Sequence, residues 1–122
     1  MKIAITGATG FLGRALMQRL LAAGHQLRCW TRHESPPSSS AALQWIHGEL
    51  GDSSACAQLV SGSDALIHAA LWRPGKGFRG AEGDVVEFAQ RNVIGSLQLF
   101  QAAVTSRLQR VVYVSSCSVH EE

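Results

Sequence analysis

The segment Gly7-Ala8-Thr9-Gly10-Phe11-Leu12-Gly13 places three glycines at the junction of an apolar run, residues 2–6, and a segment with helical spacing, residues 11–23. The apolar run is predicted to be a buried strand, because both of its faces carry apolar or small side chains. Gly24 supplies the left-handed residue that commonly ends a helix. The helical spacing rests on Leu12, Leu16, Leu20 and Ala23.

Strands and helices alternate along the rest of the sequence. Apolar and β-branched runs predict strands at residues 26–31, 43–46, 64–69 and 110–115, and helical spacing predicts helices at 53–60 and 85–105. The segments 34–42 and 72–83 are predicted to be loops. Such alternation favours a parallel sheet covered on both faces. We therefore predict a single α/β domain over residues 1–122, a doubly wound sheet of five strands in the order 3-2-1-4-5.

The composition excludes several classes of protein. Hydrophobic residues make up 46% of the chain and charged residues 16%, which predicts a packed core. The net charge of +2, from 11 basic and 9 acidic residues, indicates neither nucleic acid nor a membrane surface as a partner. Cys29, Cys56 and Cys117 have no metal-ligand spacing, so we expect free thiols and no metal. No signal peptide or membrane span is predicted, and we expect a cytoplasmic protein.

Each glycine has its own role in a turn of this kind. Gly7 permits a tight turn out of the strand, Gly10 lets a ligand approach the backbone, and Gly13 lets the helix pack closely. Unpaired N–H groups and the dipole at the helix N-terminus stabilise a pyrophosphate. A glycine turn between a strand and a helix is the dinucleotide fingerprint of a Rossmann-type fold. The alternative is a tight turn with no ligand.

The residue after the second strand indicates which cofactor is bound. An acidic residue there binds the ribose hydroxyls of NAD, whereas arginine accommodates the 2′-phosphate of NADP. This chain has Arg32, with Arg28 and His33 nearby, and its first acidic residue is delayed to Glu34. The sequence therefore favours NADP. Glu34 keeps NAD as an alternative, and Arg32 could also be a solvated residue at the end of a strand.

Five segments in order resemble the extended or atypical short-chain dehydrogenase/reductases, including the NAD-dependent epimerase/dehydratase family. The resemblance covers the whole chain and rests on residues 6–13 (TGATGFLG), 48–52 (GELGD), 64–70 (DALIHAA), 92–96 (NVIGS) and 114–119 (VSSCSV). It implies a Rossmann-type cofactor domain that lacks the last strands and the substrate-binding portion of the family. Relatives are two to three times longer, so the chain is expected to be an amino-terminal part.

The resemblance also implies which residues bind the cofactor. Leu50 and Asp52 would lie against the adenine. Asp52 could also simply cap the helix that begins near Ser53, and the two roles are compatible. Ala69 and Ala70 would line the channel to the nicotinamide. With the turn and Arg32, the complete set of predicted cofactor-binding residues is Gly7, Thr9, Gly10, Phe11, Leu12, Gly13, Arg32, Leu50, Asp52, Ala69 and Ala70.

Two residues align with positions that serve catalysis in the family. Ser116 matches the serine that orients the substrate oxygen, with Ser115 as its competitor, and Asn92 matches a structural or proton-relay position. Asn92 could also be an ordinary amide on a helix face. His68 is interpreted as a packed core residue rather than a catalytic base. The family's Tyr-x-x-x-Lys pair, which supplies the proton donor, does not occur among the 122 residues.

These features predict the NAD(P)-binding portion of an oxidoreductase or epimerase/dehydratase. Such an enzyme transfers hydride to or from a carbonyl or hydroxyl substrate, and a nucleotide sugar is one possible substrate. Without Tyr-x-x-x-Lys, this chain alone is expected to be inactive. A non-catalytic NADP-binding sensor or regulatory protein is the alternative. An apolar stripe on the 85–105 helix favours a homodimer and consists of Val86, Ala89, Val93, Ile94, Leu97, Phe100 and Val104.

Overall fold

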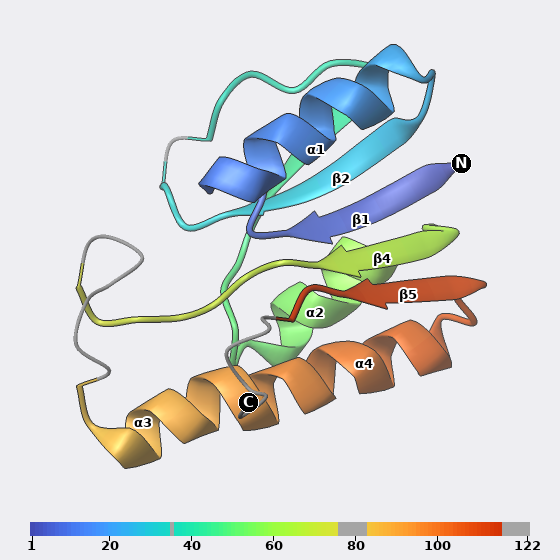
Figure 1. Ribbon diagram of the computed structural model, residues 1–122. Helices are drawn as coiled ribbons and strands as arrows, with labels where there is room; N and C mark the ends of the chain where they lie inside the picture. The colour runs from blue at the N-terminus through green and yellow to red at the C-terminus, as the bar shows by residue number, and fades with distance from the viewer. Residues whose placement is uncertain (35, 76–82, 116–122) are drawn as a thin grey trace, which may run out of the picture.

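A five-stranded parallel sheet forms the centre of the molecule (Figure 1). The computed structural model describes residues 1–34, 36–75 and 83–115. Its strand order, β3-β2-β1-β4-β5, and the parallel pairing of neighbouring strands confirm the predicted fold class. The strands are β1 (Lys2–Thr6), β2 (Gln26–Thr31), β3 (Leu43–His47), β4 (Ala65–His68) and β5 (Arg110–Tyr113).

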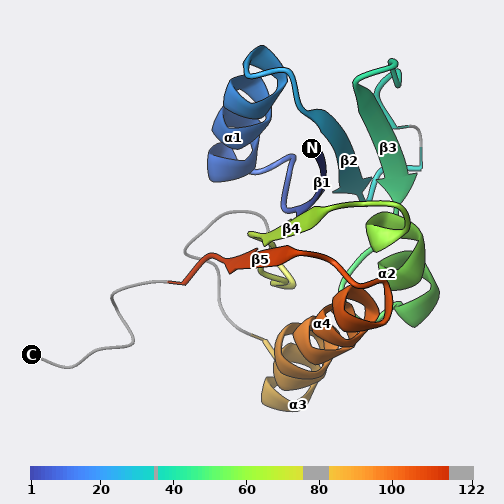
Figure 2. The ribbon, with the colours of Figure 1, turned by 90° about the vertical axis from the view of Figure 1, so that its right-hand side faces the viewer.

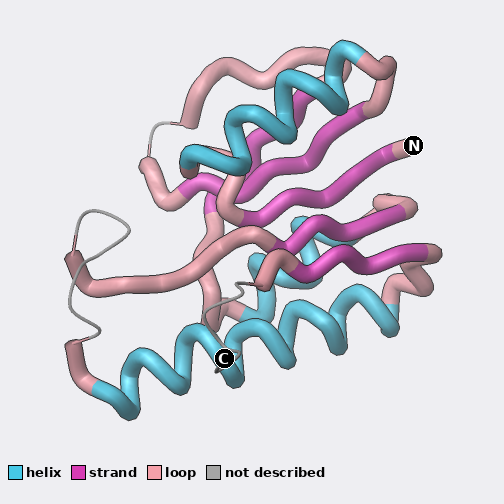
Figure 3. Tube along the Cα trace, in the orientation of Figure 1, coloured by secondary structure: helices cyan, strands magenta, loops and turns pink. Residues whose placement is uncertain are grey.

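Helices cover both faces of this sheet and enclose two cores (Figures 2 and 3). Helix α1 (Phe11–Ala22) packs on one face, and α2 (Ser53–Val60) packs with α4 (Gly95–Thr105) on the other. Side chains of a strand point alternately to its two faces, so each strand contributes to both cores. The α1 core contains Ile3, Ile5, Ala8, Leu27 and Cys29, and the opposite core contains Ala4, Trp30, Ile46, Leu50, Ala55, Cys56, Leu59, Val60, Leu66, Leu99 and Ala103.

The face of helix α1 that packs on the sheet agrees only in part with the leucine spacing in the sequence. Met17, Leu20 and Leu21 pack against the core, together with the buried Gly13. Leu12, which was placed in the predicted stripe, is 45% exposed. Gly24 follows the helix at φ +84°, in the left-handed conformation expected of a helix stop. The helix and its stop were therefore predicted correctly, and of the predicted spacing Leu20 packs against the core whereas Leu12 does not.

The long helix predicted at 85–105 is present but contains an irregular turn. It begins as α3 (Val85–Ala89), continues as a π-helical segment, η1 (Gln90–Ile94), and ends as α4. Its buried face consists of Gly95, Ser96, Leu99 and Ala103, whereas most of the predicted apolar stripe faces outward. No helix in the described part of the chain is both long enough and apolar enough to cross a membrane.

Strand β5 lies at one edge of the sheet and is exposed along its whole length (Figure 1). Val111, Val112 and Tyr113 are 44%, 48% and 58% exposed. The strand ends at Tyr113, two residues before the predicted end at residue 115. The edge is therefore an apolar surface without a neighbouring strand among the described residues.

Candidate functional site

A pocket of about 530 Å³ opens at the carboxyl ends of the strands. The chain turns toward α1 after β1 and toward the opposite face after β4, and these two strands are neighbours. The place where the connections of two neighbouring strands leave toward opposite faces of the sheet is called the switch point. Ligands of open α/β sheets bind there. The pocket is lined by Gly7, Thr9, Gly10, Phe11, Leu12, Gly13, Trp30, Thr31, Arg32, Gly48, Glu49, Leu50, Ala69, Ala70, Leu71, Trp72, Arg73, Gly75 and Val114.

The glycine turn brings β1, α1 and the segment after β4 into close contact. Gly7 has φ +74°, and a Cβ added to it would lie 2.7 Å from the Ala69 carbonyl carbon. A Cβ on Gly13 would lie only 2.0 Å from the Gly7 carbonyl oxygen. Both positions therefore require glycine for packing within the chain.

Gly10 differs from the other two glycines of the turn. Its φ is −77°, which any residue adopts, and an added Cβ would meet only the Gly7 carbonyl oxygen, at 3.3 Å. Gly10 lines the pocket, so a side chain there would occupy space otherwise open to a ligand. Packing within the chain therefore requires glycine less strictly at position 10 than at positions 7 and 13.

The N-terminus of α1 faces the pocket without competing groups from its own first turn. Gly10 is the N-cap and offers no side-chain cap, and the first turn contains no acidic residue. The first N–H groups of a helix have no acceptor within the helix. Together with the helix dipole, these N–H groups are of the kind that could hold an anion.

Two arginines of the β2 region have separate roles. Arg32 is exposed at the pocket, with no hydrogen-bond or ion-pair partner within the part of the chain that the structure describes. Arg28 instead donates to the carbonyl oxygens of Gln58 and Leu59, at the C-terminal end of α2. Arg28 is therefore held away from the pocket, whereas Arg32 lines it, as does Arg73.

The predicted cofactor residues gather around this pocket, with Asp52 as the exception. Asp52 is the N-cap of α2, and its Oδ1 accepts a hydrogen bond from the Ala55 N–H at 3.0 Å. This capping role is the alternative that the sequence left open. Leu50, Ala69 and Ala70 line the pocket with Arg32 and the glycine turn.

His68 is fully buried in a chain of hydrogen bonds. The Thr6 hydroxyl accepts from the Ala69 and Ala70 N–H groups, both at 3.2 Å, so its own hydrogen is left to donate to His68 Nδ1 at 2.6 Å. His68 Nε2 then carries the proton and donates to Ser96 Oγ at 2.8 Å. Burial lowers the pKa of His68 from 6.5 to about 4. The neutral ring thus holds the segment after β4 in place, in agreement with the core interpretation.

Asn92 fixes the same segment from the π-helical side. Its Oδ1 accepts from the Trp72 N–H at 2.7 Å, and its Nδ2 donates to the carbonyl oxygens of Trp72 and Phe88. Both Nδ2 hydrogens are used in these bonds. The structure therefore gives Asn92 a positioning contact. Ser116 lies outside the described residues, and Ser115 follows Val114 as an exposed residue.

Sequence reasoning missed several residues that line the pocket. Trp30 lies near the end of β2, and Glu49 follows β3. Their position after strand ends is a signal that could have identified them. Among residues 1–34, 36–75 and 83–115, no group of three metal-ligating side chains forms a potential metal site.

A glycine turn at the switch point of a 3-2-1-4-5 parallel sheet defines a Rossmann-type nucleotide-binding domain. The chain belongs to the NAD dependent epimerase/dehydratase family, whose sequence model matches residues 3–122. It is 35% identical to a 2-alkyl-3-oxoalkanoate reductase of Stenotrophomonas maltophilia over 98% of this chain and 34% of that protein. It is 33% identical to a 3 beta-hydroxysteroid dehydrogenase/Delta 5→4-isomerase of Mycobacterium tuberculosis over 97% of this chain and 32% of that protein. The chain thus spans about a third of these relatives.

Solved structures of similar proteins contain NAD. MoeE5 in complex with UDP-glucose and NAD aligns with a TM-score of 0.81 at 26% identity, over 99% of this chain and 38% of that one. A short-chain dehydrogenase/reductase superfamily protein from Agrobacterium tumefaciens with bound NAD aligns with a TM-score of 0.77 at 27% identity, over 95% of this chain and 33% of that one. The chain matches the NAD(P)-binding portion of the family.

The buried His68 predicts a loss of stability in acid. Between pH 6.5 and about 4 the unfolded chain takes up a proton that folded His68 does not, so the free energy of unfolding falls as the pH falls. From pH 7 to pH 5 this loss amounts to about 2 kcal/mol, which urea unfolding would measure.

His68→Asn serves as the control, because it removes this imidazole and leaves every other ionisable group of the chain in place. The loss between pH 7 and pH 5 should be clearly smaller in the variant. An equal loss in both proteins would contradict the assignment, as would an NMR titration that gives folded His68 a pKa near 6.5.

Proposed function

We propose that this chain is the NADP-binding portion of an oxidoreductase or epimerase/dehydratase that transfers hydride between the nicotinamide and a carbonyl or hydroxyl substrate. The observation that carries the proposal is the uncapped N-terminus of α1 at a pocket whose glycine turn leaves room at Gly10. The N–H groups and the dipole of α1 would hold the pyrophosphate without a lysine.

Arg32 supports NADP as the cofactor. Its guanidinium lies at the pocket, at the end of β2, where it would pair with a 2′-phosphate. NAD is the alternative, supported by Glu34 two residues later and by the NAD bound in the similar structures. The free position of Arg32, compared with the capping role of Arg28, favours NADP.

The remaining site residues would receive the two ends of the cofactor. Leu50 would pack on the adenine, with Asp52 beside it at the start of α2. Ala69 and Ala70 would leave space for the ribose and nicotinamide, because larger side chains there would enter the pocket. Thr9, Phe11 and Leu12 would border the pyrophosphate at the turn.

The substrate and the catalytic step are proposed from the family. Ser116 would orient the substrate oxygen, and Asn92 would hold the segment after β4. Similar proteins bind UDP-glucose or UDP-glucuronic acid with NAD, so a nucleotide sugar is the substrate class that we propose. Because the 122 residues contain no Tyr-x-x-x-Lys, we expect them to bind cofactor without transferring hydride by themselves.

Filling the space at Gly10 tests the pyrophosphate site. Gly10→Val should weaken NADPH binding at least tenfold, about 1.4 kcal/mol, because its side chain would occupy the approach to the helix N-terminus. Calorimetric titration measures the affinity. Gly10→Ala should give a smaller loss, and thermal unfolding checks that both variants fold. Wild-type affinity in a folded Gly10→Val variant would refute the site.

Arg32→Gln tests the choice of cofactor. The wild-type chain should bind NADPH more tightly than NADH, and the variant should lose about tenfold or more of its NADPH affinity, because a charge-assisted contact to phosphate is removed. Its affinity for NADH should change little. Arg19→Gln, at the exposed end of α1, makes the same change of charge and should leave both affinities unchanged. Tighter binding of NADH by the wild type would overturn the argument.

We also propose that the helix formed by residues 85–105 joins two copies of the chain. Val86, Leu97 and Val104 are 74%, 57% and 72% exposed along this helix. Several exposed apolar side chains on one helix are typical of a protein interaction surface. Leu97→Glu should convert a dimer to a monomer in analytical ultracentrifugation. Gln101→Glu, on the same helix, adds the same charge and should not. A monomeric wild type would exclude the dimer.

A further inference from the structure

Arg91 connects two segments of the pocket that come from well-separated strands. Glu49 follows β3 and Trp72 follows β4, and both residues line the pocket. Strands β2 and β1 lie between β3 and β4 in the sheet. Arg91, on the π-helical segment η1, contacts both residues although it does not itself line the pocket. We call Glu49 and Trp72 the two rims of the pocket. Arg91 therefore contacts both rims from outside the pocket.

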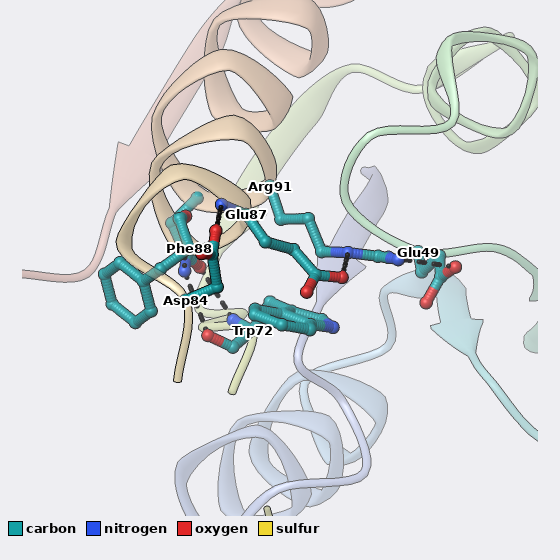
Figure 4. A network of polar contacts seen from close by, with 7 residues as sticks. Glu49, Trp72, Asp84, Glu87, Phe88 and Arg91 are labelled. Atoms are coloured by element: carbon teal, nitrogen blue, oxygen red, sulfur yellow. Dashed lines mark hydrogen bonds and ion pairs between the residues drawn. The ribbon is translucent and has the colours of Figure 1, made fainter. Parts of the chain in front are cut away.

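The guanidinium of Arg91 makes three contacts (Figure 4). Its Nη1 lies 3.2 Å from Glu49 Oε1, and its Cζ lies 4.9 Å from the centre of the Trp72 ring. Its Nε lies 3.4 Å from Glu87 Oε1, one turn earlier on the same helix. A planar guanidinium can pair with a carboxylate and stack on an aromatic ring at the same time, which a lysine ammonium does less well.

The backbone of Trp72 is held independently of this contact. Asn92, the next residue after Arg91, binds both the N–H and the carbonyl oxygen of Trp72. The two neighbouring residues thus hold the backbone and the ring of the same tryptophan. They do so from a π-helical segment, and such segments occur frequently at functional sites.

We infer that Arg91 is a positioning residue that straps the Glu49 and Trp72 rims of the pocket together and thereby raises the affinity for the dinucleotide. This inference rests on the proposed function. Without these contacts, the Trp72 ring and the Glu49 side chain would have to be ordered when the ligand binds, and that ordering reduces affinity. The contacts are partly exposed, with Arg91 and Glu49 side chains 30% and 45% accessible, so the expected effect is moderate.

The test compares Arg91→Gln, Glu49→Gln and the double variant by calorimetric titration with NADPH. We expect Arg91→Gln to weaken binding about three- to tenfold. Glu49→Gln should weaken binding in the wild-type background and have no further effect in the Arg91→Gln background, because Glu49 acts through Arg91. Glu87→Gln removes only the pair within the helix and should leave the affinity within about twofold of wild type.

A second measurement follows the rim directly. The Trp72 indole N–H signal in the NMR spectrum, assigned with Trp72→Phe, should shift in Arg91→Gln and stay in place in Glu87→Gln. Wild-type affinity in Arg91→Gln would overturn the inference, and so would additive effects of Glu49→Gln and Arg91→Gln. A wild-type chain that binds neither NADPH nor NADH would instead refute the proposed function, and the strap's role would fall with it.

Discussion

The close approach between Gly13 and Gly7 is the constraint on which the rest of the site depends. No atom larger than hydrogen fits between the start of α1 and the turn after β1, and the same turn lies against the Ala69 backbone. Because the approach is so close, the N-terminus of α1, the end of β1 and the segment after β4 meet at one place. The pocket forms where they meet. Thr6, which is paired with His68, binds the backbone of the segment after β4 that lines it.

The fold was largely predictable, because strand and helix periodicities are local properties of the sequence. The buried faces were not. Leu12 and Met17 both belong to apolar helical patterns in α1, and only the contact with the sheet selects Met17. In the same way Leu97 and Leu99 lie two residues apart on α4, and Leu99 is buried while Leu97 is exposed. Periodicity shows that a helix is amphipathic, but the surrounding structure decides which face is covered.

The candidate site likewise has one part that the sequence indicated and another that only the three-dimensional structure shows. The glycine turn was found from its place between a strand and a helix, and Leu50, Ala69 and Ala70 were found because they lie in segments that resemble the family. The roles of these residues in binding remain predictions. The contacts of Arg91 with Glu49 and Trp72 join residues far apart in the chain, and no local pattern indicates them. The sequence selected Arg32 by its place after the second strand, but only the position of α2 shows that the nearby Arg28 is occupied by carbonyl oxygens of that helix. The π-helical turn likewise leaves no mark in the apolar spacing.

Strand β5 belongs to two regions of the molecule at once. Its outer edge is exposed, and Val114, directly after its end, lines the pocket. The Val114 N–H also donates to the His68 carbonyl oxygen at 2.9 Å, so the pairing of β5 with β4 continues to the residue that lines the pocket. The edge of the sheet and one wall of the pocket are therefore formed by consecutive residues of one segment, and a displacement of β5 would move both.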